Sequence, residues 1–184
     1  PIIDAGIRAD DKDETCREGL ERDYFCKKED GTPFVAAVWP GEAYFADFLR
    51  PEVRSWFGGR YRALTELGID GFWNDMNEPA LFYTPDRLKA AVQRAAELGA
   101  KGNLDMYAFS ELQQLINGLS NNPDDYRSFY HLVDGQPVRH DRVHNLYGGN
   151  MTRAAGEALQ ALRPDRRTLL YSRSSSIGSH RYGG

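Results

Sequence analysis

The chain has little cysteine and no long apolar run. Cys16 and Cys26 are its only two cysteines, and neither belongs to a CxxC pair, so the pattern indicates neither a disulfide framework nor a zinc site. Two free thiols weakly favour a reducing, cytoplasmic location. No apolar run approaches the roughly 20 residues that cross a bilayer, and no signal peptide is recognisable, so the sequence gives no support for a membrane partner.

The chain also lacks an excess of basic charge. Its 23 Lys and Arg are scattered among 27 Asp and Glu, for a net charge of -4 and a pI near 5.6. Because nucleic-acid binding needs a clustered positive surface, we expect no nucleic-acid partner. Aromatic residues, by contrast, make up 12% of the chain, a content that suits sugar stacking as well as core packing.

Helical and strand-like segments alternate through much of the sequence. Apolar spacing and Gly or Pro punctuation predict a strand within 1–7, a charged surface excursion after it, and then strands over 34–39, 69–73 and 168–171 and helices over 51–67, 85–98, 106–119 and 150–162. A helix that ends at Gly68 and leads into a strand is typical of an α/β fold with a parallel sheet or barrel.

The segment GIDGFWNDMNEPALF, residues 68–82, combines an apolar strand with polar chemistry. Asp75 falls just past the predicted strand end, and Pro79 prevents the strand from continuing. In barrels of alternating strands and helices, catalytic residues lie at the C-terminal ends of strands. Asp75 is therefore a candidate catalytic residue, and Arg173 lies at the corresponding end of the strand predicted over 168–171.

Several short motifs occur in a recognisable order. They are IIDAGI (2–7), VWPG (38–41), ADF (46–48), WNDMNEP (73–79), VHNLYG (143–148) and SRSSSIGSHRYGG (172–184). Together they resemble glycoside hydrolase family 31, the retaining α-glucosidase and α-xylosidase family. The likeness extends over nearly the whole chain, with a more variable middle from about 83 to 142.

The resemblance implies a fold and a domain organisation. A complete (β/α)8 TIM barrel takes about 250 residues, so we expect an incomplete chain that carries roughly the third to fifth strand-helix units. Residues 1–82 would then be a barrel segment with the nucleophile strand, residues 83–142 an inserted subdomain, and residues 143–184 a barrel segment that continues to the next strand. The remainder of the parent catalytic domain would be a partner.

The resemblance also assigns roles to residues. It implies that Asp75 is the catalytic nucleophile and that Arg173 bonds a sugar hydroxyl and holds this carboxylate ionised. Substrate binding would further involve four apolar side chains, Trp39, Trp73, Met76 and Ile7. No metal or other cofactor is expected.

Other polar residues near these motifs are expected to support the scaffold. Glu78 lies past a turn and is predicted to face its own backbone or a basic neighbour, and Asp47 is predicted to be structural. For His144 and His180 we expect neutral rings that hydrogen-bond within the scaffold.

The chain departs from a complete enzyme of the family at one essential point. The family's acid/base Asp follows the HRYGG residues, whereas this chain ends at Gly184. Since acid assistance contributes about 10²–10⁴-fold, we expect the isolated chain to be inactive. Two milder departures are Ser176, where an aromatic residue is usual, and Ala46, where Pro is usual.

These observations predict part of a retaining α-glucosidase that releases terminal, non-reducing α-linked glucose from oligosaccharides through a covalent glycosyl-enzyme intermediate. An α-xylosidase or an α-glucosyltransferase on the same scaffold, and a noncatalytic carbohydrate-binding relative, remain alternatives. A Mg²⁺ hydrolase that uses Asp75 and Glu78 is less favoured, because no third acid is predicted at a strand end.

Overall fold

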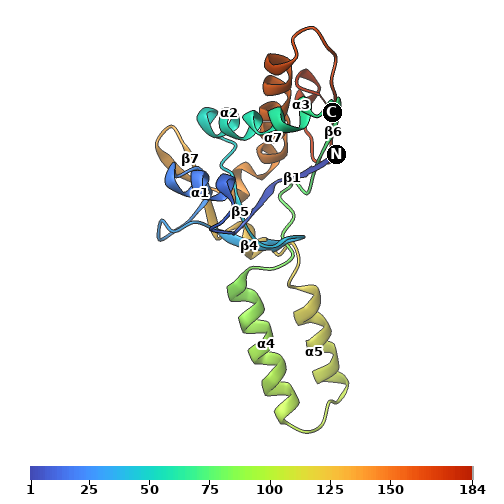
Figure 1. Ribbon diagram of the computed structural model, residues 1–184. Helices are drawn as coiled ribbons and strands as arrows, with labels where there is room; N and C mark the ends of the chain where they lie inside the picture. The colour runs from blue at the N-terminus through green and yellow to red at the C-terminus, as the bar shows by residue number, and fades with distance from the viewer. Residues whose placement is uncertain (184) are drawn as a thin grey trace.

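The computed structural model describes residues 1–183 as a mixed α/β body from which a helical hairpin projects (Figure 1). The strands form three small sheets, with the orders β1-β6-β9, β2-β5-β4 and β3-β7-β8. The bounds of the strands are β1 Ile2–Asp4, β2 Gly6–Arg8, β3 Lys27–Lys28, β4 Val35–Val38, β5 Gly41–Phe45, β6 Gly71–Asp75, β7 Phe129–Val133, β8 Gln136–Arg139 and β9 Leu169–Ser172.

The sheet β1-β6-β9 is parallel throughout, as the alternation of helices and strands predicts. Strand β6 was expected over 69–73 and lies two residues later, so Asp75 is its last residue rather than the residue beyond its end. The other two sheets are antiparallel. The strand expected within 1–7 is divided at Ala5, because β1 pairs with β6 while β2 pairs with β5.

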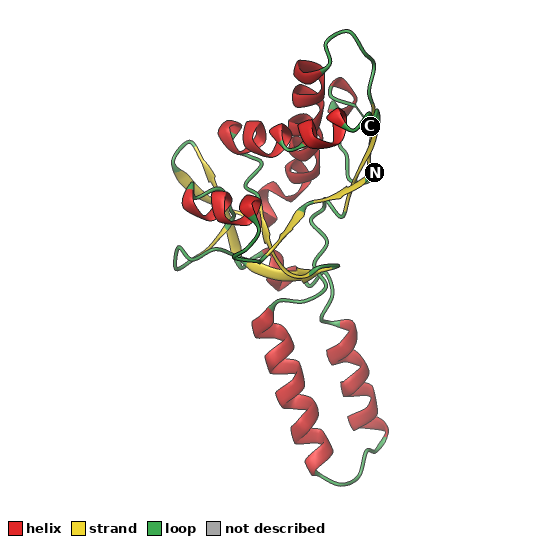
Figure 2. Cartoon of the chain, in the orientation of Figure 1, coloured by secondary structure: helices red, strands yellow, loops and turns green. Residues whose placement is uncertain are grey.

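Helices cover one face of the parallel sheet, as Figure 2 shows in red beside the yellow strands. They are α2 (Pro51–Gly59), α3 (Tyr61–Glu66) and α7 (His140–Leu162). Phe72 and Leu170 point into this layer and belong to the main core. The single helix expected over 51–67 is broken at Arg60, directly after Gly58 and Gly59, which disfavour a continuous helix.

Two glycines allow α7 to approach its neighbours closely. A Cβ on Gly58 of α2 would lie 2.4 Å from the carbonyl oxygen of Ala154, and one on Gly148 would lie 2.7 Å from the carbonyl oxygens of Asn77 and Ser174. Helix α7 starts ten residues earlier than predicted, at His140 rather than at 150. The prediction was wrong there because Gly148 and Gly149 lower helix propensity, whereas tertiary packing requires a small residue at Gly148.

The segment expected as an insertion, 83–142, contains two structural parts. Helices α4 (Pro85–Ala100) and α5 (Met106–Asn117) form the hairpin that extends away from the body in Figure 1, drawn in green and yellow. The short helix α6 (Pro123–Tyr126) follows, and then strands β7 and β8, of which β7 pairs with β3. The second part thus belongs to a sheet that also contains residues from before position 83.

The charged excursion after residue 8 contains a helix that its sequence pattern does not predict. Helix α1 (Glu14–Glu21) is capped by Asp13, whose carboxylate accepts the backbone N–H of Cys16 at 2.8 Å. Both cysteines are buried and free, as expected. The 3-10 helix η1 (Ser179–Arg181) ends the described fold. Among residues 1–183, no helix is both long and apolar enough to cross a membrane.

Candidate active site

Three charged residues follow one another across the C-terminal ends of the parallel strands. Asp4 of β1 is the register partner of Asp75 of β6. On the other side of β6, Arg173 comes directly after β9, and its backbone N–H donates to the carbonyl of Asn74 at 3.0 Å. Because neighbouring parallel strands align their side chains, Asp4, Asp75 and Arg173 share one edge of the sheet.

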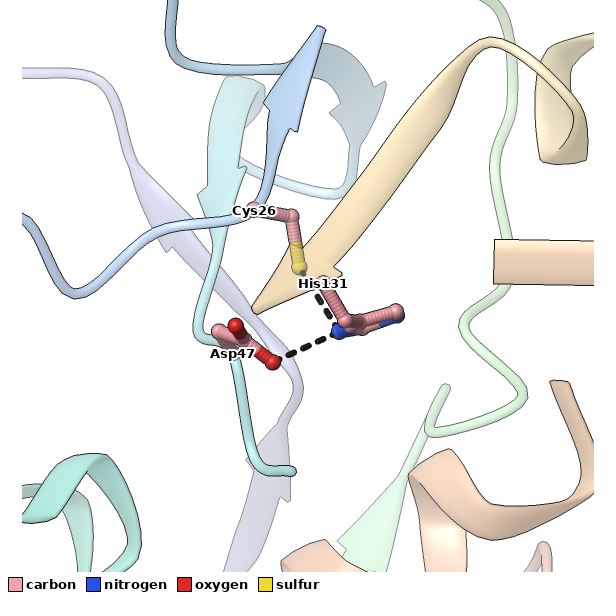
Figure 3. Close-up of side chains that lie close together, drawn as sticks. All are labelled: Cys26, Asp47 and His131. Carbon is pink, nitrogen blue, oxygen red and sulfur yellow. Dashed lines mark hydrogen bonds and ion pairs between the residues drawn. The ribbon is translucent and has the colours of Figure 1, made fainter. Parts of the chain in front are cut away.

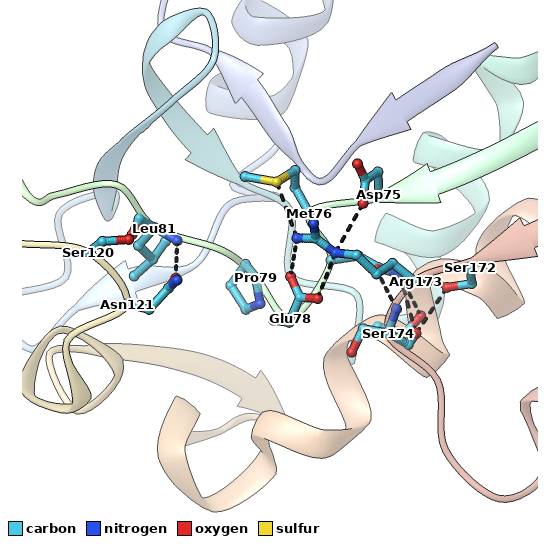
Figure 4. Close-up of polar contacts among 12 residues, drawn as sticks. Asp75, Met76, Glu78, Pro79, Leu81, Ser120, Asn121, Ser172, Arg173 and Ser174 are labelled. Atoms are coloured by element: carbon cyan, nitrogen blue, oxygen red, sulfur yellow. Dashed lines mark hydrogen bonds and ion pairs between the residues drawn. The ribbon is translucent and has the colours of Figure 1, made fainter.

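Arg173 joins two carboxylates at this edge (Figure 4). Its Nε and Nη2 donate to the two oxygens of Glu78 at 3.0 and 2.9 Å, a bidentate pair. The same Nε lies 3.0 Å from Oδ1 of Asp75. The bond to Glu78 is the main cause that raises the pKa of Arg173. Glu78 therefore faces a basic neighbour, and it fixes the guanidinium beside Asp75.

The ion pair between Asp75 and Arg173 is not a hydrogen bond. The Nε atom has one N–H, and this N–H is directed at Glu78. The Oδ1 atom of Asp75 is buried and has no hydrogen-bond donor among the described residues. The buried Oδ1 thus lies next to a positive charge while the Asp75 side chain as a whole stays 16% exposed at the strand end, an arrangement that suits a carboxylate nucleophile.

Asp4 is a second acid at the same edge. Burial is the main cause that raises the pKa of its carboxyl group, the nearby Asp75 carboxylate raises it further, and Arg173 opposes both effects. A proton is thus retained more readily by Asp4 than by an isolated Asp.

Asn77 holds both neighbours of Arg173. Its Nδ2 donates to Oγ of Ser172 at 2.9 Å, and its Oδ1 accepts the backbone N–H of Ser174 at 3.0 Å. The Ser172 hydroxyl in turn donates to the carbonyl of Ser174 at 2.9 Å. Asn77 is completely buried. It therefore connects the loop after β6 to the loop after β9 on either side of the guanidinium.

Met76 lies between Asp75 and Asn77 in the sequence and adopts an unusual backbone conformation. Its φ of 54° lies in the left-handed region, which costs a residue with a side chain about 1–2 kcal/mol. Its sulfur accepts from Nη2 of Arg173 at 3.2 Å. The turn at Met76 therefore places Asp75, Met76 and Glu78 around one guanidinium.

Trp73 lies two residues before Asp75, on the same face of β6. This face is turned away from the helices, and Trp73 contacts Tyr171 edge to face at 5.8 Å between ring centroids. Ile2 and Leu169 are exposed on the same face. An apolar surface thus extends from the charged group along the strands.

Trp39 and Ile7 lie on the antiparallel sheet rather than on the parallel one. Trp39 follows β4, is 72% exposed, and contacts Phe82 edge to face at 4.8 Å. Ile7 is opposite Tyr44 in the β2–β5 pair and packs against the main core. The structure thus brings Asp75, Met76 and Arg173 together directly, with Trp73 next to them, whereas Trp39 and Ile7 approach from another sheet.

Two members of this group were not selected from the sequence. Asp4 stands within a recognised motif and at the end of a strand, so the rule that selected Asp75 could have selected it too. Asn77 has no comparable signal, because its partners Ser172 and Ser174 are more than 90 residues away.

The position of Arg173 argues against a divalent cation between Asp75 and Glu78. The guanidinium already occupies the space between these carboxylates and binds both oxygens of Glu78. A magnesium site would need those oxygens as ligands. The geometry thus disfavours the Mg²⁺ hydrolase alternative.

Comparison with protein families gives one match that covers the whole chain. Residues 1–184 match the family described as the glycosyl hydrolases family 31 TIM-barrel domain. Alpha-glucosidase 2 of Bacillus thermoamyloliquefaciens is 31% identical over 182 residues, which is 99% of this chain and 18% of that enzyme. Alpha-xylosidase 1 of Arabidopsis thaliana is 44% identical over 82 residues, which is 44% of this chain and 9% of that enzyme.

Comparison with solved structures gives matches that are consistent with the family match. The crystal structure of the ER glucosidase II heterodimeric complex, which consists of the catalytic subunit and the binding domain of the regulatory subunit, matches with a TM-score of 0.68 and 26% identity. The match covers all of this chain and 16% of that one. The chain thus spans less than a fifth of the length of these relatives.

Proposed function

Because this chain belongs to glycoside hydrolase family 31, as part of its TIM-barrel domain, we propose that it supplies the nucleophile and part of the sugar-binding pocket of a retaining α-glucosidase. The complete protein would release terminal α-linked glucose from the non-reducing end of oligosaccharides. The observation that carries this proposal is the partly exposed Asp75 carboxylate at the C-terminal end of β6, 3.0 Å from Nε of the Arg173 guanidinium.

In the first step of the proposed reaction, the Asp75 carboxylate attacks the anomeric carbon and forms a glycosyl ester. The positive charge of Arg173 lies beside the attacking carboxylate, and its bidentate bond to Glu78 keeps the guanidinium in place while the ester forms. We also propose that Arg173 bonds a hydroxyl of the bound sugar. In the second step, water hydrolyses the ester and restores the carboxylate.

Departure of the leaving group needs a second carboxyl group about 5–5.5 Å from the nucleophile in retaining enzymes. We propose that a residue outside residues 1–184 has this acid/base role, as the resemblance in motif order implies. Asp4 lies beside Asp75 on the adjacent strand. We expect the protonation state of its carboxyl group to change the net negative charge around the proposed nucleophile.

Apolar residues would form the wall of the sugar pocket. We propose that Trp73 and Met76 contact the C–H surface of the pyranose next to Asp75, and that Trp39 and Ile7 contribute from the antiparallel sheet. Exposure of the indole of Trp39 leaves its face free for stacking.

The main alternative is α-xylosidase activity, which the 44% identity to an α-xylosidase over part of the chain favours. The two activities differ in whether the pocket admits the C6 hydroxymethyl group of glucose. A comparison of kcat/KM for aryl α-glucoside and aryl α-xyloside with the complete protein distinguishes them. An α-glucosyltransferase would instead transfer the sugar to a second saccharide, and a noncatalytic relative would turn over neither substrate.

A trapping experiment tests the assignment of the nucleophile. We expect a 5-fluoro-glycosyl fluoride to inactivate the complete protein and to leave its label on the peptide that contains Asp75, because fluorine slows hydrolysis of the ester. Peptide mass spectrometry locates the label. Labelling of Glu78 or Asp4, or no label on an active enzyme, would contradict the assignment.

Replacement of the nucleophile gives an independent test. Asp75→Ala should reduce kcat by several orders of magnitude while the protein remains folded, since no other described carboxylate has the same position. Asp11→Asn, on an exposed loop, is the matched control and should retain wild-type kcat. More than about one per cent residual activity in Asp75→Ala would exclude covalent catalysis by this residue.

A further inference from the structure

Three of the chain's four histidines form one hydrogen-bonded row that the proposed reaction does not use. Nε2 of His131 lies 2.9 Å from Nδ1 of His140, and Nε2 of His140 lies 2.9 Å from Nδ1 of His144. At the inner end, Nδ1 of His131 lies 2.7 Å from Oδ1 of Asp47. The row connects the residues after β5, strand β7 and helix α7.

The inner part of this row is inaccessible to water. Asp47, His131 and His140 are 2%, 1% and 0% exposed. The ring of His140 stacks on Phe129 at 4.3 Å, and Tyr147 packs against both buried rings. Polar atoms in such a place must satisfy one another, so each N···N contact requires one donor and one acceptor.

Asp47 provides the fixed acceptor at the inner end. Its Oδ2 accepts the backbone N–H of Leu132 at 2.7 Å, and its Oδ1 accepts that of Leu49 at 3.3 Å. A carboxylate that receives N–H groups from several sides acts as an acceptor. The proton between Asp47 and His131 therefore belongs to Nδ1 of His131.

One proton position determines the next along the row. When the single hydrogen of His131 is on Nδ1, its Nε2 is bare and accepts from Nδ1–H of His140. The bare Nε2 of His140 then accepts from Nδ1–H of His144. Burial, together with the neighbouring rings of His131 and His144, lowers the pKa of His140 to about 2. Burial likewise lowers the pKa of His144, against the opposing charge of Glu78. Both rings are thus neutral near pH 7.

A shared metal ion explains the inner end less well. Cys26, Asp47 and His131 do lie close together (Figure 3), with Sγ of Cys26 3.5 Å from Nδ1 of His131. However, two ligand atoms at about 2.0–2.2 Å from a tetrahedral zinc are more than 3 Å apart. The 2.7 Å between Oδ1 and Nδ1 is a hydrogen-bond length. Burial raises the pKa of the Cys26 thiol, so its sulfur stays protonated.

We propose that Asp47 locks His131, His140 and His144 into a single tautomer, with hydrogen on Nδ1 of every ring, and so leaves Nε2 of His144 as a hydrogen-bond acceptor at the surface. His144 lines a hollow of about 600 Å³ together with Tyr126 and Arg127. A hydroxyl or N–H group that enters this hollow would meet an acceptor whose state is set by Asp47, at the other end of the row. This inference does not depend on the proposed hydrolase activity.

Neutron diffraction from a perdeuterated crystal of the complete protein tests the proposal directly, since ordinary X-ray data do not reveal hydrogen positions. We expect deuterium on Nδ1 and none on Nε2 of His131, His140 and His144. Deuterium on Nε2 of any of the three, including a doubly protonated His131, would overturn the proposal.

The variant Asp47→Asn should reverse the whole row. Its amide oxygen can accept the Leu132 N–H in place of Oδ2, and its NH₂ group can donate to Nδ1 of His131. Each ring would then carry deuterium on Nε2. Asp11→Asn and the ring of His180, outside the row, should show no change. An unaltered His144 in a folded Asp47→Asn variant would show that the rings are not coupled, and wild-type data decide the tautomers if that variant does not crystallise.

Discussion

Asn77 occupies a position where a single amide holds two loops. Because its Nδ2 and Oδ1 bind the residues before and after Arg173, loss of the amide leaves buried polar groups without partners. We expect Asn77→Ala to reduce the free energy of unfolding by about 1–3 kcal/mol. It should also lower kcat more than it raises KM, since the guanidinium is displaced from Asp75. Denaturant unfolding and steady-state kinetics measure the two effects.

The matched control for this variant is Asn103→Ala. Asn103 is exposed in the link between α4 and α5, so its replacement should change neither quantity. A wild-type kcat in Asn77→Ala would show that the two loops hold Arg173 in place without the hydrogen bonds from Asn77 to Ser172 and Ser174.

His140 should make stability depend on pH. Its folded pKa of about 2 lies below the value of about 6.5 in an unfolded chain. Below pH 6.5 the unfolded chain therefore binds a proton that the folded chain does not. The stability that depends on His140 is therefore fully present above pH 6.5. As pH falls below this value, the free energy of unfolding decreases by about 1.4 kcal/mol per pH unit.

Comparison with His140→Gln isolates this effect, because the carboxyl groups titrate in both proteins. The difference in free energy of unfolding between wild type and variant should narrow steadily from pH 6.5 to pH 4.5 in denaturant titrations. A constant difference over that range would mean that His140 is already protonated in the folded protein.

Residue positions near Asp75 were predictable wherever one local rule decides them. The C-terminal ends of β6 and β9 place Asp75 and Arg173 at one edge. Glu78 was predicted to face its own backbone or a basic neighbour, and it contacts Arg173. The Asn77 clamp and the histidine row were not predictable, because each depends on contacts between side chains far apart in sequence.

At the scale of elements, the α4–α5 hairpin is nearly independent of the body. Leu98 and Ala108 are buried within the hairpin itself, and the base is held by Leu81, whose backbone N–H donates to Oδ1 of Asn121 at 2.8 Å, and by a bond from Arg87 to Asp125 at 2.8 Å. The outer turns thus add few contacts to the rest of the fold.

We expect the outer part of the hairpin to be dispensable for folding. Replacement of residues 92–112 by about six Gly/Ser residues, enough to join two adjacent helices, should shift the Tm of the complete protein by less than about 4 °C. Arg87→Leu should lower the Tm by more than this replacement does, because it leaves the buried Asp125 carboxylate with fewer hydrogen-bond donors. If calorimetry finds a larger decrease in Tm for the replacement of residues 92–112 than for Arg87→Leu, the end of the hairpin stabilises the body.

Apolar spacing predicted the longer helices and the parallel strands, whereas helix α1 and the short antiparallel strands β3, β5, β7 and β8 were not predicted. Helices α4 and α5 begin where Pro85 and Met106 predict them, and β4 and β9 differ by about one residue from expectation. The missed break at Arg60 follows Gly58 and Gly59, and the helix start wrongly expected at 150 follows Gly148 and Gly149. Their effect depends on which neighbour packs against them, and that neighbour is distant in sequence.

At the scale of the whole molecule, the parallel sheet has one covered and one open face. The open face presents Ile2, Trp73, Leu169 and Tyr171, and strands β1 and β9 are both edges of this sheet. Apolar faces with unpaired edges are characteristic association surfaces. The relatives are several times longer, and we infer that further strands of the barrel cover this face in the complete protein.

Residues 1–184 expressed alone should therefore self-associate and should not turn over an aryl α-glucoside. We expect sedimentation velocity to show a concentration-dependent increase in mass, and Tyr171→Lys to reduce it, because a charge on the open face opposes contact. Ile177→Lys, in an exposed loop, should leave it unchanged. A monomer with wild-type turnover would exclude the need for further strands.

Because both thiols of the chain are buried, a single introduced cysteine can be labelled selectively. Since Cys16 and Cys26 are enclosed in the interior, Asn103→Cys at the far end of the hairpin would introduce the one readily alkylated site within residues 1–183. In the complete protein, energy transfer from a fluorophore attached there to an acceptor dye on the proposed saccharide substrate would measure the distance between the end of the hairpin and the bound sugar.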